Sequence, residues 1–79
     1  MKVYIKPGCP WCVEVVEWLD AAGYKYHKLN VAEDRALYQE MIELSGQSKA
    51  PTMTYGDLLL ANFGVEELVP FLEEHGIEP

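Results

Sequence analysis

Lys6-Pro7-Gly8-Cys9-Pro10-Trp11-Cys12 is the stretch that decides the fold. It follows an apolar run at residues 3–5, leads into a helical pattern, and contains both cysteines of the chain. Two thiols three residues apart at the start of a helix lie on one face, one turn apart. They can therefore close a small disulfide ring without disturbing the rest of the fold. The proline between them suits the first helical turn, where its missing N–H costs nothing.

The start of this helix also favours a reactive thiol. Free backbone N–H groups and the positive end of the helix dipole favour an anion there, and Lys6 adds a nearby cation. In such surroundings the pKa of a thiol falls from ~8.5 to roughly 3.5–7.5. We therefore expect Cys9 to be the exposed nucleophile, and Cys12, one turn inside the helix, to be the more buried resolving thiol.

Other uses of two cysteines fit the sequence less well. A structural disulfide at this spacing would close a tiny loop and remove little entropy from the unfolded chain. A zinc site needs about four ligands, and only His27 and His75 could join the cysteines. Two inert buried thiols would not account for the Gly-Cys-Pro entry into a helix. We expect no metal site.

Composition and charge limit the class of protein. The 79 residues, 49% of them apolar, predict one globular domain over residues 1–79. The formal net charge of -7, from 13 acidic and 6 basic residues, argues against a nucleic-acid-binding surface and against binding to anionic membranes. A partner with a basic patch is favoured instead.

The sequence also suggests a cellular setting. No apolar run approaches the ~20 residues that cross a bilayer, and the N-terminus runs directly into a strand-like segment, so we expect neither a membrane span nor a signal peptide. A single Cys-x-x-Cys with no other cysteine is typical of a reducing compartment. We expect a cytoplasmic protein.

The first half of the chain reads as strand, helix, strand, helix. Residues 2–5 have apolar side chains on both faces, typical of a central strand. The next segments are a helix over residues 10–22 and a strand over residues 24–31, in which His27 reads as a solvated or edge-strand residue. The predicted buried stripe of the first helix is Cys12, Val15, Val16, Leu19 and Ala22. The second helix has Glu33 and Asp34 in its first turn, a stripe of Leu37, Met41 and Leu44, and Gly46 as its stop.

The second half reads as a hairpin and a last helix. Two parallel strands joined by the first helix form a βαβ unit. Pro51 then precedes a short strand over residues 52–55, Gly56-Asp57 is a turn signal, and residues 58–61 return antiparallel. The last helix begins at Val65. Pro70 would break a bond inside it, so this helix either effectively starts near residue 66 or 67 or is kinked.

This order of elements, with the motif at residues 6–12, Ser45-Gly46 and Ala50-Pro51, resembles the glutaredoxins, the smallest version of the thioredoxin fold. The resemblance covers nearly the whole chain. It implies an α/β fold with the order βαβαββα, in which a four-stranded mixed sheet has helices on both faces.

The resemblance also implies roles for particular residues. Cys9 resembles the attacking thiolate and Cys12 the resolving thiol. Lys6 resembles the lysine that steadies the thiolate and meets the glycine carboxylate of glutathione, and Gln47 resembles a second contact to that carboxylate. Trp11 stands where these proteins usually have tyrosine, beside any bound thiol substrate.

The remaining expected contacts to glutathione come from the backbone. Pro51 resembles the cis-proline that faces the disulfide, and a cis bond there would turn the backbone of Ala50 toward an extended thiol peptide. The acidic or hydroxyl pair that many glutaredoxins use to hold the γ-glutamyl end of glutathione is missing. Only backbone N–H groups around Gly64 and Val65 could bind that carboxylate.

The sequence therefore predicts a monomeric thiol–disulfide oxidoreductase of glutaredoxin type. It would reduce protein disulfides or glutathione mixed disulfides, with glutathione as co-substrate, glutathione reductase acting indirectly, and no tightly bound cofactor. Three alternatives stay open. The chain could be a redoxin that thioredoxin reductase reduces and that serves ribonucleotide reductase. It could be a dimer that holds a [2Fe–2S] cluster with two glutathiones. It could also be an inactive interaction domain.

Overall fold

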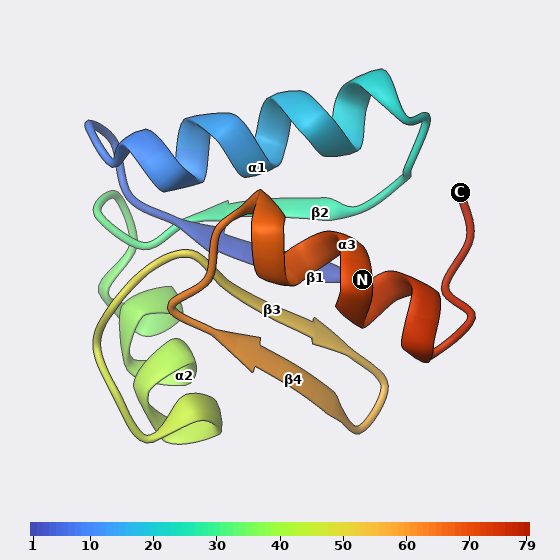
Figure 1. The fold of residues 1–79 in the computed structure, drawn as a ribbon. Helices are drawn as coiled ribbons and strands as arrows, with labels where there is room; N and C mark the ends of the chain where they lie inside the picture. Colours follow the sequence, from blue (N-terminus) through green and yellow to red (C-terminus); the bar gives the residue numbers. More distant parts are fainter.

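Seven elements follow one another in the computed structural model, which describes residues 1–79 (Figure 1). They are β1 (Lys2–Ile5), α1 (Pro10–Ala21), β2 (His27–Asn30), α2 (Arg35–Ser45), β3 (Thr52–Tyr55), β4 (Leu58–Ala61) and α3 (Val65–Glu74). This order confirms the predicted sequence of elements. None of the three helices combines the length and the apolar character that a bilayer crossing requires.

The strands form one mixed sheet in the order β2-β1-β3-β4. Strand β1 runs parallel to β2 and antiparallel to β3, and β4 is antiparallel to β3. In this register Tyr4 lies opposite Thr52. The end of β1 therefore lies beside the start of β3. This arrangement brings the Cys9 turn next to the segment that precedes β3, although more than forty residues separate them.

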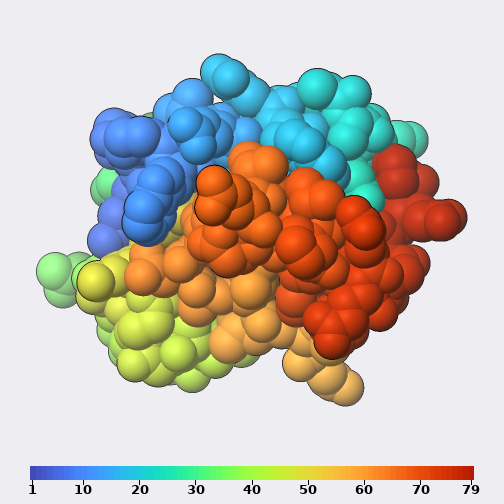
Figure 2. Space-filling model, viewed as in Figure 1, coloured from blue at the N-terminus to red at the C-terminus, as the bar shows by residue number.

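Helices cover both faces of the sheet, as predicted. On one face α1 and α3 lie side by side (Figures 1 and 2) and share a core with the sheet. The fully buried members of that core are Val3, Val15, Leu19, Met53, Phe63, Leu68, Leu72 and Ile77. On the other face α2 covers a smaller cluster of Tyr4, Val31 and Met41. Val3 lies in the first core and Tyr4 in the second, so β1 is buried on both faces, which confirms that it is a central strand.

The second strand is shorter than predicted. Only His27–Asn30 pairs with β1, because β1 itself begins at Lys2, the partner of His27. Residues 24–26 have no strand to join, and the N–H of Tyr24 instead donates to the carbonyl of Leu19 at the end of α1. His27 is exposed on this edge strand, as expected.

Three other details of the helices differ from the predictions. Ala22 is exposed, because it lies just beyond the last residue of α1. Leu44 is 52% exposed, because the single helix on that face leaves its last turn uncovered. Neither Glu33 nor Asp34 lies in the first turn of α2, because the helix begins at Arg35; Asp34 is its N-cap, and its side chain accepts a hydrogen bond from the Ala36 N–H at 2.9 Å. Gly46 ends this helix in the left-handed conformation that the sequence predicted.

The last helix starts at Val65 and runs through Pro70 to Glu74. This confirms the predicted start at Val65, and the alternative start near residue 66 or 67 is wrong. Pro70 deprives the Glu66 carbonyl of its helical partner, but both residues are exposed, so water can replace the missing donor. Beyond the helix, the Ile77 N–H donates to the Leu72 carbonyl at 2.9 Å, which folds the buried Ile77 back onto the core.

Candidate functional site

Cys9 occupies the N-cap position of α1. Its backbone is extended, with φ -90° and ψ 112°, and its Sγ accepts a hydrogen bond from the Cys12 N–H at 3.3 Å. Gly8 reaches this turn with φ 76°, a conformation that other residues rarely adopt, and Pro10 fills the first helical position. The sulfur thus lies where a helix offers free N–H groups to an anion.

Cys12 lies one turn deeper and is only 2% exposed. Burial, reinforced by its hydrogen bond with Cys9, raises the pKa of the Cys12 thiol to about 11, although a backbone hydrogen bond from Lys6 and its positive charge oppose the shift. Both cysteines are free thiols, and Cys9 is partly exposed. The geometry matches an accessible first thiol and a second thiol that is protonated at neutral pH.

The segment before β3 forms the wall opposite Cys9. The peptide bond between Ala50 and Pro51 is cis, as the resemblance implied. The Ala50 carbonyl faces the first thiol, and the Cys9 Sγ–H donates to it over 3.8 Å. Ala50 and Pro51 are both buried. The sheet register therefore places the predicted proline segment against the predicted nucleophile.

The Lys6 side chain ties the turn before Cys9 to this same wall. Its Nζ donates to the Ser48 carbonyl at 2.8 Å and lies 5.3 Å from the centroid of the Tyr38 ring. Lys6 therefore joins two segments that are 42 residues apart. Its contact to a glutathione carboxylate stays a prediction.

Gln47 braces the loop between α2 and β3 with both ends of its amide. Its Oε1 accepts from the Lys49 N–H at 2.6 Å. Its Nε2 donates to the Ser45 Oγ at 3.0 Å, to the Lys49 carbonyl at 3.1 Å and to the Thr52 Oγ1 at 3.2 Å. These bonds give the side chain a structural role. Its predicted contact to glutathione stays untested.

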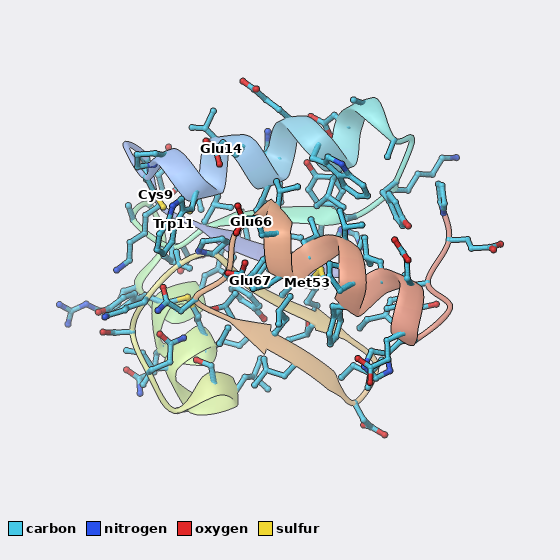
Figure 3. All side chains as sticks on the ribbon, viewed as in Figure 1. Cys9, Trp11, Glu14, Met53, Glu66 and Glu67 are labelled. Carbon is cyan, nitrogen blue, oxygen red and sulfur yellow. The ribbon has the colours of Figure 1, made fainter.

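Trp11 points away from the core beside Cys9 and is 52% exposed (Figure 3). It forms one wall of a hollow of about 200 Å³ between the starts of α1 and α3. The residues that line this hollow, which we call the notch, are Trp11, Glu14, Gly64, Val65, Glu66 and Glu67. The structure thus brings together Trp11, Gly64 and Val65, three residues with an expected contact to glutathione, and that contact stays a prediction.

The sequence analysis missed the three glutamates of the notch. Glu14 lies outside the buried stripe predicted for the first helix, and residues 66 and 67 enter the sequence analysis only as a possible start of the last helix. The Gly64 N–H, which we had expected to hold a substrate carboxylate, donates to the Glu67 Oε1 at 3.2 Å. A glutamate three residues after a helix cap is a recognised capping pattern, and it could have indicated this bond.

Comparisons with known proteins agree with this geometry. The glutaredoxin family model matches residues 1–59. An uncharacterized glutaredoxin-like 8.6 kDa protein in the rubredoxin operon of Clostridium pasteurianum is 31% identical over 74 residues, which cover 94% of this chain and 99% of the relative.

Solved structures give the same result. The crystal structure of the thioredoxin-like protein BC3987 matches with a TM-score of 0.80 and 30% identity, over 90% of this chain and 97% of that one. A glutaredoxin from Archaeoglobus fulgidus matches with a TM-score of 0.77 over 90% of this chain and 83% of that one, and its 20% identity shows the shared fold alone. With its Cys-Pro-Trp-Cys helix start set against a cis-proline, this chain belongs to the glutaredoxin family.

Proposed function

We propose that this chain is a thiol–disulfide oxidoreductase in which Cys9 attacks and Cys12 resolves. One observation carries the proposal: the partly exposed Cys9 Sγ caps α1 and accepts the Cys12 N–H at 3.3 Å, while the second thiol is buried directly behind it. A helix N-terminus stabilises the thiolate that exchange requires. The buried thiol is already placed to attack the first sulfur.

The reaction conserves atoms and electrons in two exchange steps. The Cys9 thiolate attacks one sulfur of a substrate disulfide, forms a mixed disulfide, and releases the other sulfur as a thiolate that takes a proton. Cys12 then loses its proton and attacks the Cys9 Sγ, which releases the second substrate thiolate. The substrate gains two electrons and two protons, and the protein leaves as the Cys9–Cys12 disulfide.

Several features of the sequence-based prediction belong to this proposal. The two thiols carry both electrons, so the reaction needs no resident cofactor. The substrates are disulfides of other proteins or glutathione mixed disulfides, and glutathione is the candidate co-substrate that restores the dithiol. We propose a monomer that works in the reducing cytoplasm, where such a dithiol stays available for reaction.

A second candidate differs only in its electron donor. Three groups expected to hold glutathione already have partners within the chain: the Lys6 ammonium on the Ser48 carbonyl, the Gln47 amide within its loop, and the Gly64 N–H on Glu67. These bonds favour a protein reductase of the thioredoxin reductase class as the donor, because such a partner needs no glutathione pocket.

A donor test distinguishes the candidates. The oxidised protein is given NADPH with either glutathione and glutathione reductase or thioredoxin reductase, and NADPH consumption is followed with a disulfide substrate present. Turnover in either mixture supports the proposed exchange and identifies the donor. Cys9→Ser should abolish turnover, whereas Cys12→Ser should keep glutathione-dependent turnover and lose the reduction of protein disulfides. Failure in both mixtures, or full activity of Cys9→Ser, would overturn the proposal.

A further inference from the structure

The notch beside Cys9 carries a concentrated negative charge. Three of its six lining residues are glutamates and none is a lysine or arginine. Figure 3 shows Glu14 on α1 and Glu66 and Glu67 at the start of α3, on the same side as Trp11 and Cys9. The only ion pair in the structure joins Lys2 to Glu40, so no cation of the chain neutralises these carboxylates.

The helix end in the notch is already supplied with an anion. A helix N-terminus attracts carboxylates through its free N–H groups and its dipole. Here the Glu67 carboxylate accepts from the Gly64 N–H at 3.2 Å, so a negative charge of the chain itself already lies at this helix end. An incoming carboxylate would therefore meet the negative charge of Glu67 and of two further glutamates, Glu14 and Glu66.

The exposed indole provides the other half of a binding surface. Trp11 is 52% exposed, lies two residues from the nucleophile, and lines the same hollow as the glutamates. An aromatic face attracts cations, and tryptophan does so most strongly. The aliphatic stem of a lysine or arginine can lie on such a ring while its charged end meets carboxylates.

We propose that the notch selects substrates in which a lysine or arginine lies next to the cysteine that Cys9 attacks. Glu14, Glu66 and Glu67 are then specificity-determining residues, and substrates with a carboxylate at that place react more slowly. This inference rests on the proposed exchange activity. It narrows the substrate class to polypeptide disulfides with basic flanks.

Three synthetic peptides test the inference. Each carries one cysteine as a mixed disulfide with 2-thiopyridine, and they differ only in flanking residues, which are lysine, glutamine or glutamate. The release of thiopyridone by the reduced protein gives the second-order rate constant. We expect the lysine peptide to react at least about tenfold faster than the glutamate peptide at low salt, the lower end of the range for steered association. The preference should shrink in about 1 M salt, where the Debye length is ~3 Å.

Two triple variants separate the notch from the overall charge. Replacing Glu14, Glu66 and Glu67 by glutamine removes three charges from the notch, and glutamine at position 67 can still accept the Gly64 N–H. The control replaces three exposed glutamates outside the notch by glutamine and removes the same charge; they are Glu43, Glu74 and Glu78.

The outcomes distinguish this inference from the proposed function. In the notch variant, we expect the ratio of the rate constants for the lysine and glutamate peptides to fall to about twofold, while the control variant keeps most of the original ratio. The inference would be overturned if the two variants lost the same share of the lysine preference, or if the unmodified protein reacted equally fast with all three peptides. Either result would leave the exchange activity intact. No reaction with any peptide would remove the proposed exchange activity, and the inference with it.

Discussion

Replacing Gln47 by alanine should destabilise the protein through the loop that carries the cis-proline. The substitution removes one bond accepted from the Lys49 N–H at 2.6 Å and the bonds that Nε2 donates, the longest of which reaches Thr52 at 3.2 Å. A neutral hydrogen bond contributes about 1 kcal/mol net, and water can reach the exposed Lys49 N–H after the substitution. The buried Thr52 hydroxyl keeps its bond to the Lys49 carbonyl. We therefore expect a loss of about 2 kcal/mol in the free energy of unfolding.

Urea denaturation followed by fluorescence measures this loss. With an m value of about 1 kcal/mol/M for a chain of this size, the midpoint should fall by about 2 M. Gln39→Ala is the matched control, because Gln39 is exposed on α2 and its midpoint should stay within about 0.5 M. A Gln47→Ala midpoint equal to that of the control would refute the stabilising role of the Gln47 hydrogen bonds. A normal stability combined with a raised KM for glutathione mixed disulfides would instead make Gln47 a substrate contact.

Four further predictions concern the second thiol, the packing of the helices and the proline in the last helix. Burial, the largest cause of the raised pKa of Cys12, remains in Cys9→Ser, so alkylation of Cys12 in this variant should still rise steeply between about pH 9 and about pH 10; a rate that levels off in that interval, as it does for an ordinary thiol, would contradict the burial. The same raised pKa means that the folded state loses stability as the pH rises through about 9 to about 11, since the unfolded thiol ionises first. Leu68→Ala should lower the free energy of unfolding by about 2–5 kcal/mol, because Leu68 is fully buried. Leu44→Ala, at a half-exposed side chain, should lower it by less than about 1 kcal/mol. A larger loss in Leu44→Ala than in Leu68→Ala would contradict the packing of α2 and α3 described above. Pro70→Ala should stabilise the protein by about 1–2 kcal/mol, because it restores a helical N–H, and a lower thermal midpoint would contradict the continuous helix.

The order of elements could be predicted because local signals mark most boundaries. Gly46 stops α2, Pro51 precedes β3, and Gly56 opens the hairpin, and each is a residue whose backbone preference acts within a few positions. The start of β2 could not be predicted in this way. It depends on where β1 begins, and Tyr24 has the strand-forming side chain that the sequence favours but no partner strand to pair with.

The reactive pair could also be predicted, because a helix start and a three-residue spacing are local properties. The surroundings of the pair depend on segments that are distant in sequence. Lys6 lies on the Ser48 carbonyl, 42 residues away, and the notch joins Glu14 to Glu66 across two helices. A charge that faces solvent on an isolated helix becomes part of a shared hollow only when the fold sets two helix starts side by side (Figure 3).

The most direct test of the central claim compares the two single-thiol variants. Cys12→Ser and Cys9→Ser are each reduced and mixed with a small neutral disulfide near neutral pH, and the rate of mixed-disulfide formation is measured by mass spectrometry. Because Cys12 is buried and burial is the largest cause that raises its pKa, the variant that keeps Cys9 should react about 100-fold faster or more. Equal rates, or faster reaction at Cys12, would contradict the assignment of Cys9 as the nucleophile.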